Sequence, residues 1–416
     1  MRENLLHIFD KSEQFHKLAS QNEADMETVQ RKREVWIDYL RVIACFMVLT
    51  VHSTEPFYLG GEGSQILSLN EGIWAAIFLS VTRGCVALFV IASSYLQFPI
   101  HYPTGEFLRR RATRVLVPLV VWLLIYAFYW GEPVHNLRDL LVNFNYSAGH
   151  LWFVYMLIGL YLLMPLLSPW AEKVGKKELQ AYICIWLFTS LIPFIRDYLG
   201  GGQLSMTYGT GGLPQFARYP VWGEASWNLY GTFYYFSGFI GYLLLGLYLR
   251  KFVGELSWGK TLSVSIPCLL GGFAICGGGF LRRIFLSSGG EFPYSGPLSQ
   301  GVWWETSLFN DALGTVLVTI GFILIIRKIS CEGKFYRKVV LPVSQASYGM
   351  YLGHMIILAA FSGLFLGIFG RGEEGILGIW TPPVEILLTA FCSYTCAAIA
   401  AVLIRKIPKV GKWIIG

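Results

Sequence analysis

Two ionisable residues lie on one face of the first long apolar segment of this 416-residue chain. Arg41 and His52 are 11 residues apart. On an α-helix this spacing places them within roughly 20° of the same face and ~16 Å apart along the axis. Ionisable side chains in an apolar segment are costly to bury, so they indicate a functional site. A cation at one end and an imidazole deeper in favour a channel for a long anionic ligand.

Two nearby carboxylates extend this face. Glu55 follows His52 by three residues, and Asp38 precedes Arg41 by three. A carboxylate beside an imidazole can hold it in one tautomer, as a general base requires, while Asp38 could pair with Arg41. The competing interpretation is that Arg41 reaches to the lipid headgroups and that His52 only packs between helices.

A second basic group opens a later apolar segment. Arg109, Arg110, Arg111 and Arg114 precede it, and Arg111 and Arg114 are spaced to point the same way. The guanidinium group is well suited to phosphate. Together with Arg41, this pair predicts a pocket for a polyphosphate. The alternative is that these arginines are ordinary cytoplasmic anchors of a membrane helix.

The elements that must position these residues are membrane helices. The chain is 54% hydrophobic and only 14% charged, with a mean hydropathy of +0.51. Apolar stretches of about 20 residues recur, each long enough to cross ~30 Å of hydrocarbon. The fold predicted is all-α: a polytopic membrane protein with about ten transmembrane helices in one bundle. The predicted spans are roughly 36–56, 73–97, 113–130, 150–170, 179–197, 230–250, 261–281, 305–327, 341–367 and 383–404.

The basic residues predict the orientation of these spans. With the N-terminus in the cytoplasm, the inside segments hold 25 Lys and Arg residues and the outside loops hold 6, as the positive-inside rule requires. The predicted organisation is a cytoplasmic tail at 1–34, a membrane domain at 35–405 and a cytoplasmic tail at 406–416. The net charge of +7 follows from this topology, so no nucleic-acid partner is expected. Membrane lipids are the expected partners of the apolar surface.

The cysteines and histidines predict no metal site. Most of the eight cysteines fall inside apolar segments and none forms a Cys-x-x-Cys pair, while the seven histidines lack ligand spacing. Buried cysteines of this kind usually behave as small apolar side chains.

These motifs also carry a resemblance. Arg41 and His52 in the first span, followed by Arg111-x-x-Arg114 at the third, resemble the acyltransferase 3 family of integral membrane acyltransferases. Further similar stretches run in order to the end of the bundle, and the match covers roughly residues 34–404. They are Val86-Ala-Leu-Phe89 through Ser93-Ser94-Tyr95, Gly149-His150-Leu-Trp152, and Ser347-Tyr348-Gly-Met-Tyr351-Leu-Gly-His354. Ser94 stands where the family usually has glycine, which could affect close helix packing there.

The resemblance implies transfer of a short acyl group, most simply acetyl, from cytoplasmic acyl-CoA to a hydroxyl of a glycan. The glycan would be at the cell surface, in the periplasm or linked to lipid, and the protein would lie in a bacterial inner membrane. The family's essential histidine carries over to His52, its first-span arginine to Arg41, and its arginine pair to Arg111 and Arg114. Acyl-CoA, expected to be acetyl-CoA, would be a co-substrate, with no bound cofactor.

The acceptor side is less defined. His150 and Tyr155 near the outer end of the fourth span, Glu305 near the eighth, and Tyr348 in the ninth are candidates, although each could equally serve helix packing. Two other functions remain open. An exporter of a glycan or lipid could use the same buried polar residues and would predict paired inverted halves, and an inert scaffold of the same fold would lack the two basic motifs.

Overall fold

The computed structural model describes most of the chain. The described residues are 33–60, 63–131, 134–135, 137, 146–199, 230–296, 307–372, 375–408 and 410–416. The chain divides into two compact units, Met1–Val35 and Trp36–Gly416, and the second holds the helical bundle. Glu305 and nearly all of the predicted N-terminal tail lie outside the described residues.

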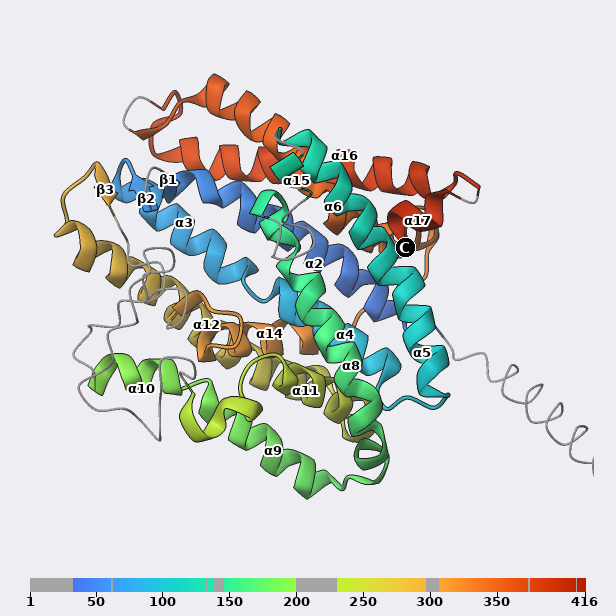
Figure 1. Cartoon of the computed structure of the whole chain (residues 1–416). Coiled ribbons are helices and arrows are strands. Elements are labelled where there is room, and N and C mark those ends of the chain that lie inside the picture. The colour runs from blue at the N-terminus through green and yellow to red at the C-terminus, as the bar shows by residue number, and fades with distance from the viewer. Residues whose placement is uncertain are drawn as a thin grey trace, which may run out of the picture. The chain divides into compact units, whose positions relative to one another are not determined.

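Helices make up nearly all of the described architecture (Figure 1). They are α2 (Val35–Thr54), α3 (Leu69–Thr82), α4 (Cys85–Gln97), α5 (Thr104–Arg111), α6 (Val117–Tyr129), α8 (Trp152–Lys173), α9 (Lys176–Thr189), α10 (Ile192–Leu199), α11 (Ile240–Phe252), α12 (Trp258–Ser288), α14 (Leu313–Ile326), α15 (Leu341–Phe369), α16 (Thr381–Arg405) and α17 (Gly411–Ile415).

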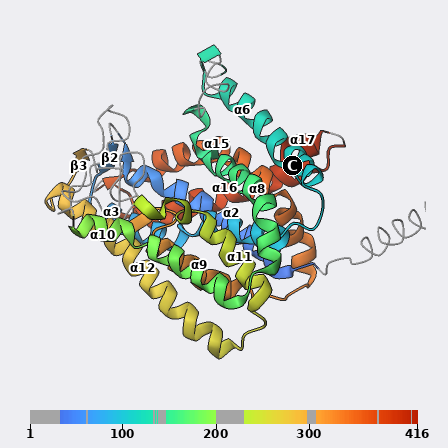
Figure 2. The same ribbon diagram turned by 60° about the horizontal axis from the view of Figure 1, so that its bottom comes forward.

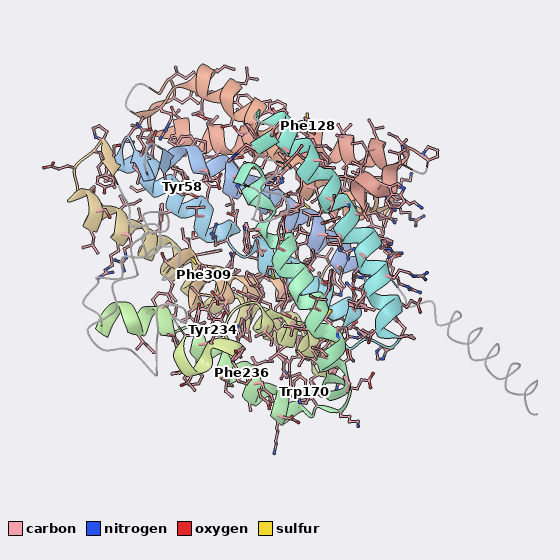
Figure 3. The ribbon with its side chains drawn as sticks, viewed as in Figure 1. Tyr58, Phe128, Trp170, Tyr234, Phe236 and Phe309 are labelled. Atoms are coloured by element: carbon pink, nitrogen blue, oxygen red, sulfur yellow. The ribbon has the colours of Figure 1, made fainter. Side chains whose placement is uncertain are left out.

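Eight helical stretches of the described chain are long and apolar enough to cross a membrane, which confirms the all-α polytopic fold. They are Val35–Phe57, Leu69–Gln97, Thr104–Tyr129, Ala148–Lys173, Lys176–Ile195, Trp258–Ser288, Tyr336–Phe369 and Gly378–Arg405. Large apolar side chains also cover the outside of the bundle, among them Phe128, Tyr234 and Phe236 (Figure 3). A surface of this kind is expected where a protein faces lipid rather than water.

The predicted spans at 230–250 and 305–327 are shorter than expected. Their regular parts are α11, with 13 residues, and α14, with 14, so each helix is ~20 Å long. Irregular turns replace their first parts: a 3-10 turn at Gly231–Phe236 and a turn at 307–312. The predicted span at 73–97 is also interrupted, between α3 and α4. Such irregular backbone is tolerated at membrane depth where it lines a cavity.

Helix α2 runs through the middle of the bundle. Figure 1 shows α3 and α4 on one side of it and α15 on the other, and the rotated view in Figure 2 again shows α2 surrounded by other helices. Its side chains Leu40, Ala44 and Leu49 are almost completely buried. The first span can therefore present polar side chains to the interior of the protein rather than to lipid.

A small antiparallel sheet, which the sequence did not predict, lies beyond the end of α2. Strand β1 (Leu59–Gly60) pairs with β2 (Gly63–Ile66), and β2 pairs with β3 (Tyr294–Gly296). The sheet joins the segment after α2 to the segment after α12, so it ties together two parts of the chain that are far apart in sequence.

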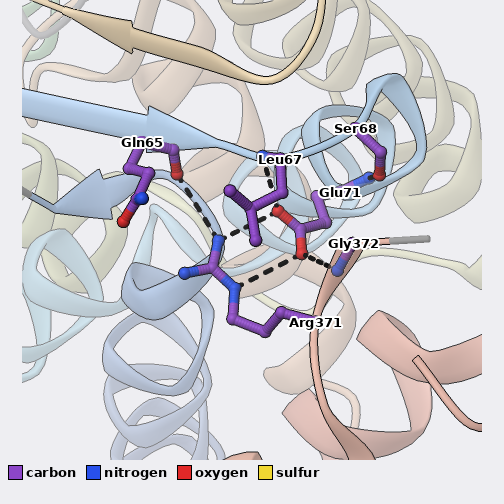
Figure 4. Close-up of polar contacts among 6 residues, drawn as sticks. All are labelled: Gln65, Leu67, Ser68, Glu71, Arg371 and Gly372. Atoms are coloured by element: carbon purple, nitrogen blue, oxygen red, sulfur yellow. Dashed lines mark hydrogen bonds and ion pairs between the residues drawn. The ribbon is translucent and has the colours of Figure 1, made fainter. Parts of the chain in front are cut away.

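A buried ion pair fixes the start of α3 to the connection between α15 and α16 (Figure 4). Glu71 is 1% exposed, and Arg371 donates to its carboxylate at 2.9 Å. The backbone N–H groups of Leu67 and Gly372 donate to the same carboxylate, each at 3.0 Å. Because a buried charge is costly without such partners, this set of donors makes the contact between the two segments specific.

Helices α4 and α11 pack very closely at the position of Ser94. The Ser94 hydroxyl donates to the backbone oxygen of Leu243 at 2.6 Å. A side chain at Gly246 would lie 2.5 Å from the Ser94 Cβ, so glycine on α11 makes room for serine on α4. The hydroxymethyl group of Ser94 is thus accommodated by the opposite helix and ties the two helices together.

Candidate active site

A cavity of about 670 Å³ lies at the end of α2. His52, in the last turn of α2, and Glu55, which begins the following 3-10 turn, both line it. His52 Nδ1 lies 2.8 Å from Glu55 Oε1, and the two side chains are 19% and 26% exposed. With its Nδ1–H donated to the carboxylate, the imidazole keeps a lone pair on Nε2 and can accept a proton from a ligand in the cavity.

The interruptions of the helices surround this cavity. Cys85 and Trp152, the first residues of α4 and α8, line it, as does Phe239, which caps α11. Phe309 (labelled in Figure 3) and Asn310, just before α14, complete this side. The N-terminal ends of α4, α8 and α11 therefore border one cavity, and helix N-termini favour negative charge nearby. Such an environment can stabilise a negative charge that develops on a bound ligand.

Arg83 adds a buried positive charge to the same cavity, and the sequence reasoning gave it no role. It lies in the break between α3 and α4, is 6% exposed, and donates from Nε to the backbone oxygen of Leu308 at 2.6 Å. It also interacts electrostatically with Glu55. The sequence did contain a signal for Arg83: an arginine in the middle of an apolar span is as unusual there as Arg41 is in the first span.

Three histidines from three helical segments cluster beside this cavity. The ring centroid of His354 lies 5.2 Å from that of His52 and 5.3 Å from that of His150. His354 is completely buried, and its Nδ1 lies 2.5 Å from the backbone oxygen of Tyr351. The Nε2 atoms of His354 and His150 are buried without a hydrogen-bond partner. His150 and His52 thus line the same cavity and both lie beside His354.

A second cavity, of about 270 Å³, brings together the three predicted arginines. Arg41 comes from α2, Arg111 ends α5, and Arg114 lies in the π-helical turn Ala112–Leu116 that joins α5 to α6. Guanidinium groups from two parts of the chain therefore converge on one space. This donor set fits a ligand with several phosphate oxygens.

Aromatic rings hold Arg111 in this cavity. Its guanidinium carbon lies 5.6 Å from the ring centroid of Phe107 and 5.5 Å from that of Tyr161. Its Nε is buried and has no hydrogen-bond partner. A guanidinium stacked on two rings is fixed in position, yet it keeps donor capacity for a ligand.

Asp38 forms hydrogen bonds next to the arginine cavity. Its two carboxylate oxygens accept hydrogen bonds from the hydroxyls of Tyr336, at 2.7 Å, and Ser344, at 2.6 Å. Ser344 itself lines the cavity. These bonds connect the start of α2, which carries Arg41, to the start of α15.

The structure does not bring the remaining predicted residues together in one cavity. Tyr348 lines the arginine cavity, and its hydroxyl donates to the backbone oxygen of Val115 at 2.8 Å. Helix α15 runs from the arginine cavity towards the histidines. Tyr348 lies one helical turn before Tyr351 on this helix, and therefore on the side away from His52. Tyr155 on α8 is 38% exposed and lines neither cavity. Among the described residues, no group of His, Cys, Asp and Glu side chains is placed to hold a metal ion.

The two cavities lie at opposite ends of one face of α2. Arg41 lines one and His52 lines the other, so the predicted face is real in the folded chain. A cationic pocket and an imidazole–carboxylate pair are thus arranged along one line, about 16 Å apart. This arrangement can bind a long anionic molecule at one end and remove a proton at the other.

Comparison with known families gives one match. A family model described as "Acyltransferase domain", that of the acyltransferase 3 family, matches residues 34–402, which is nearly the whole chain. Comparisons with curated proteins and with solved structures returned no match. The eight membrane-crossing stretches and the family match together lead to one conclusion: the chain belongs to the acyltransferase 3 family and is a multi-pass membrane acyltransferase.

Proposed function

We propose that this protein transfers a short acyl group, acetyl in the first instance, from acyl-CoA to a hydroxyl of a cell-surface or periplasmic glycan. One observation carries the proposal. The side chains of Arg41 and His52 reach two cavities at the two ends of the same helix, and the first of these cavities also contains Arg111 and Arg114. Coenzyme A has a phosphorylated head and a slender arm that ends in the thioester, so its charge and length suit this arrangement.

The proposed orientation follows the distribution of basic residues. The arginine cavity faces the cytoplasm, where acyl-CoA is made, and the His52 cavity faces the outside, where the glycan lies. The phosphates bind Arg41, Arg111 and Arg114 through charge-assisted hydrogen bonds. The arm extends along α2 and places the thioester carbonyl in the cavity that His52 and Glu55 line.

The proposed reaction is a direct transfer. His52 Nε2 takes the proton of the sugar hydroxyl, and the oxygen forms a bond with the thioester carbonyl carbon. Arg83 and the helix N-termini around the cavity stabilise the negative charge on the carbonyl oxygen. When the carbon–sulfur bond breaks, His52 returns the proton to the departing thiolate. Glu55 keeps Nδ1 protonated throughout and stabilises the imidazolium between these two steps.

The experiment is mass spectrometry of surface glycans from a deletion strain complemented with variant genes. We expect the wild-type gene to restore an acylated glycan and the His52→Ala gene to restore none, although the protein is present in the membrane at the same level. His101→Ala is the matched control, since His101 is 49% exposed and belongs to neither cavity. Full acylation with His52→Ala would refute the assignment, and the mass added to the glycan would identify the acyl group.

A further inference from the structure

The arginine cavity and the His52 cavity meet at two aromatic residues. Among the residues that line the two cavities, Phe153 and Tyr351 are shared. Both are more than nine-tenths buried. They come from α8 and α15, two helices that are far apart in sequence, so the boundary between the cavities is made by one ring from each.

The order of residues along the helices shows that this boundary crosses the bundle. Four helices, α2, α4, α8 and α15, line both cavities. On each helix the residues of one cavity are separated along the chain from those of the other. In the arginine cavity they are Arg41, Phe89, Leu157 and Tyr348, and in the His52 cavity they are Val48, Val86, Trp152 and Met355. The cavities are therefore stacked along the helices, with Phe153 and Tyr351 between them.

The two rings are in contact across this boundary. Their centroids are 5.4 Å apart with an interplanar angle of 76°, an edge-to-face contact that leaves no room for another chain of atoms between the two rings. The Tyr351 hydroxyl donates to the backbone oxygen of His150 at 2.5 Å, which fixes its ring. Phe153 is held by ring contacts with Tyr351 and Phe89, and it has no polar atom to anchor it.

We infer that Phe153 and Tyr351 form an aromatic gate that the arm of the donor must open, and that the Phe153 ring is the part that moves. This inference rests on the proposed function, because it assumes a donor whose head binds the arginines and whose thioester reaches His52. Tyr351 stays in place through its hydrogen bond, so the width of the opening is set by how far Phe153 can turn. The gate then determines how wide an acyl group can reach His52.

The first test compares a ligand that has the arm with one that lacks it. Coenzyme A and adenosine 3′,5′-bisphosphate share the phosphorylated head, and their affinities can be measured with the purified protein in lipid nanodiscs. Phe153→Ala removes the ring that must be displaced, so the affinity for coenzyme A relative to the bisphosphate should rise at least tenfold. Leu157→Ala is the matched control, since Leu157 lies one turn along the same helix and lines only the arginine cavity.

The sign of the change decides the inference. If the arm merely lies against a fixed Phe153, the alanine variant binds coenzyme A more weakly than wild type, and the gate is refuted. An equal change in Phe153→Ala and Leu157→Ala refutes it as well. If neither ligand binds the wild-type protein, the proposed donor itself is wrong, and the inference of a gate is refuted as well. Phe153→Leu, which fills more of the space, should shift the ratio in the same direction by a smaller factor.

The second test concerns the width of the acyl group. Thiol release from benzoyl-CoA and acetyl-CoA is followed in the presence of envelope glycan from the source cells. The ratio of kcat/KM for benzoyl-CoA to that for acetyl-CoA should rise at least tenfold in Phe153→Ala and stay within twofold of wild type in Leu157→Ala. An unchanged ratio in an active Phe153→Ala protein would overturn the assignment of selectivity to this ring.

Discussion

The pair formed by His52 and Glu55 allows a prediction whose size can be worked out from the structure. Glu55→Gln keeps an oxygen that can accept the Nδ1–H bond, now 2.8 Å long, but it removes the negative charge. A hydrogen bond to a charged group contributes about 1.5–3 kcal/mol and a neutral one about 0.5–1.5 kcal/mol. The difference, about 1–1.5 kcal/mol, acts when the imidazolium forms, so kcat should fall about 5- to 10-fold.

Glu55→Ala should have a larger effect. It removes both the charge and the acceptor, so His52 is no longer held with its proton on Nδ1, and part of the imidazole population presents a protonated Nε2 to the substrate. The contribution of a positioned general base is about 10²- to 10⁴-fold, which sets the upper limit for the loss. We therefore expect the order wild type, Glu55→Gln, Glu55→Ala, with the alanine variant at least tenfold below the glutamine variant.

The assay is the initial rate of thiol release from acetyl-CoA by purified protein, with envelope glycan as acceptor. Glu178→Gln is the matched control, because the Glu178 carboxylate accepts a hydrogen bond from Trp170 Nε1 at 2.8 Å and lines neither cavity. It should retain the wild-type rate. Wild-type rates in both Glu55 variants, alongside an inactive His52→Ala protein, would show that the carboxylate neither orients nor stabilises the imidazole.

Two further predictions concern the arginine cavity and the packing of the bundle. Arg111→Ala should weaken coenzyme A binding, measured by calorimetry, about tenfold or more, and the affinity that remains should depend less on salt concentration. Arg109→Ala, at an exposed position, is the control and should bind coenzyme A normally. Equal losses of affinity in the two variants would argue against a phosphate site. Gly241→Ala places a Cβ 1.9 Å from the Trp186 ring, so overpacking should lower stability by about 1–3 kcal/mol or more. A thermal-unfolding scan should show a lower Tm for Gly241→Ala than for wild type. Gly159→Ala, whose Cβ meets nothing within 4 Å, should keep the wild-type Tm. Equal Tm values for the two variants would contradict the packing seen at α11.

The sequence by itself was sufficient for the all-α membrane fold and for the face shared by Arg41 and His52, but not for the breaks and shortened helices around the cavity. Both depend on short-range regularities: the length of an apolar run, and the 3.6-residue period of a helix. The bond between His52 and Glu55 is local in the same sense, since the two residues are three apart. Arg83 was open to the same reasoning, because it also interrupts an apolar span.

Only the tertiary structure decided which helices meet. Arg41 joins Arg111 and Arg114 in one cavity because α2, the end of α5 and the π-helical turn that follows α5 line the same space. His354 comes beside His52 from more than 300 residues along the chain. The same packing placed Tyr348 in the arginine cavity and brought rings from α8 and α15 into contact at the boundary between the cavities. Contacts between distant helices depend on shape and on close approach at small residues, neither of which has a period that can be read along the chain.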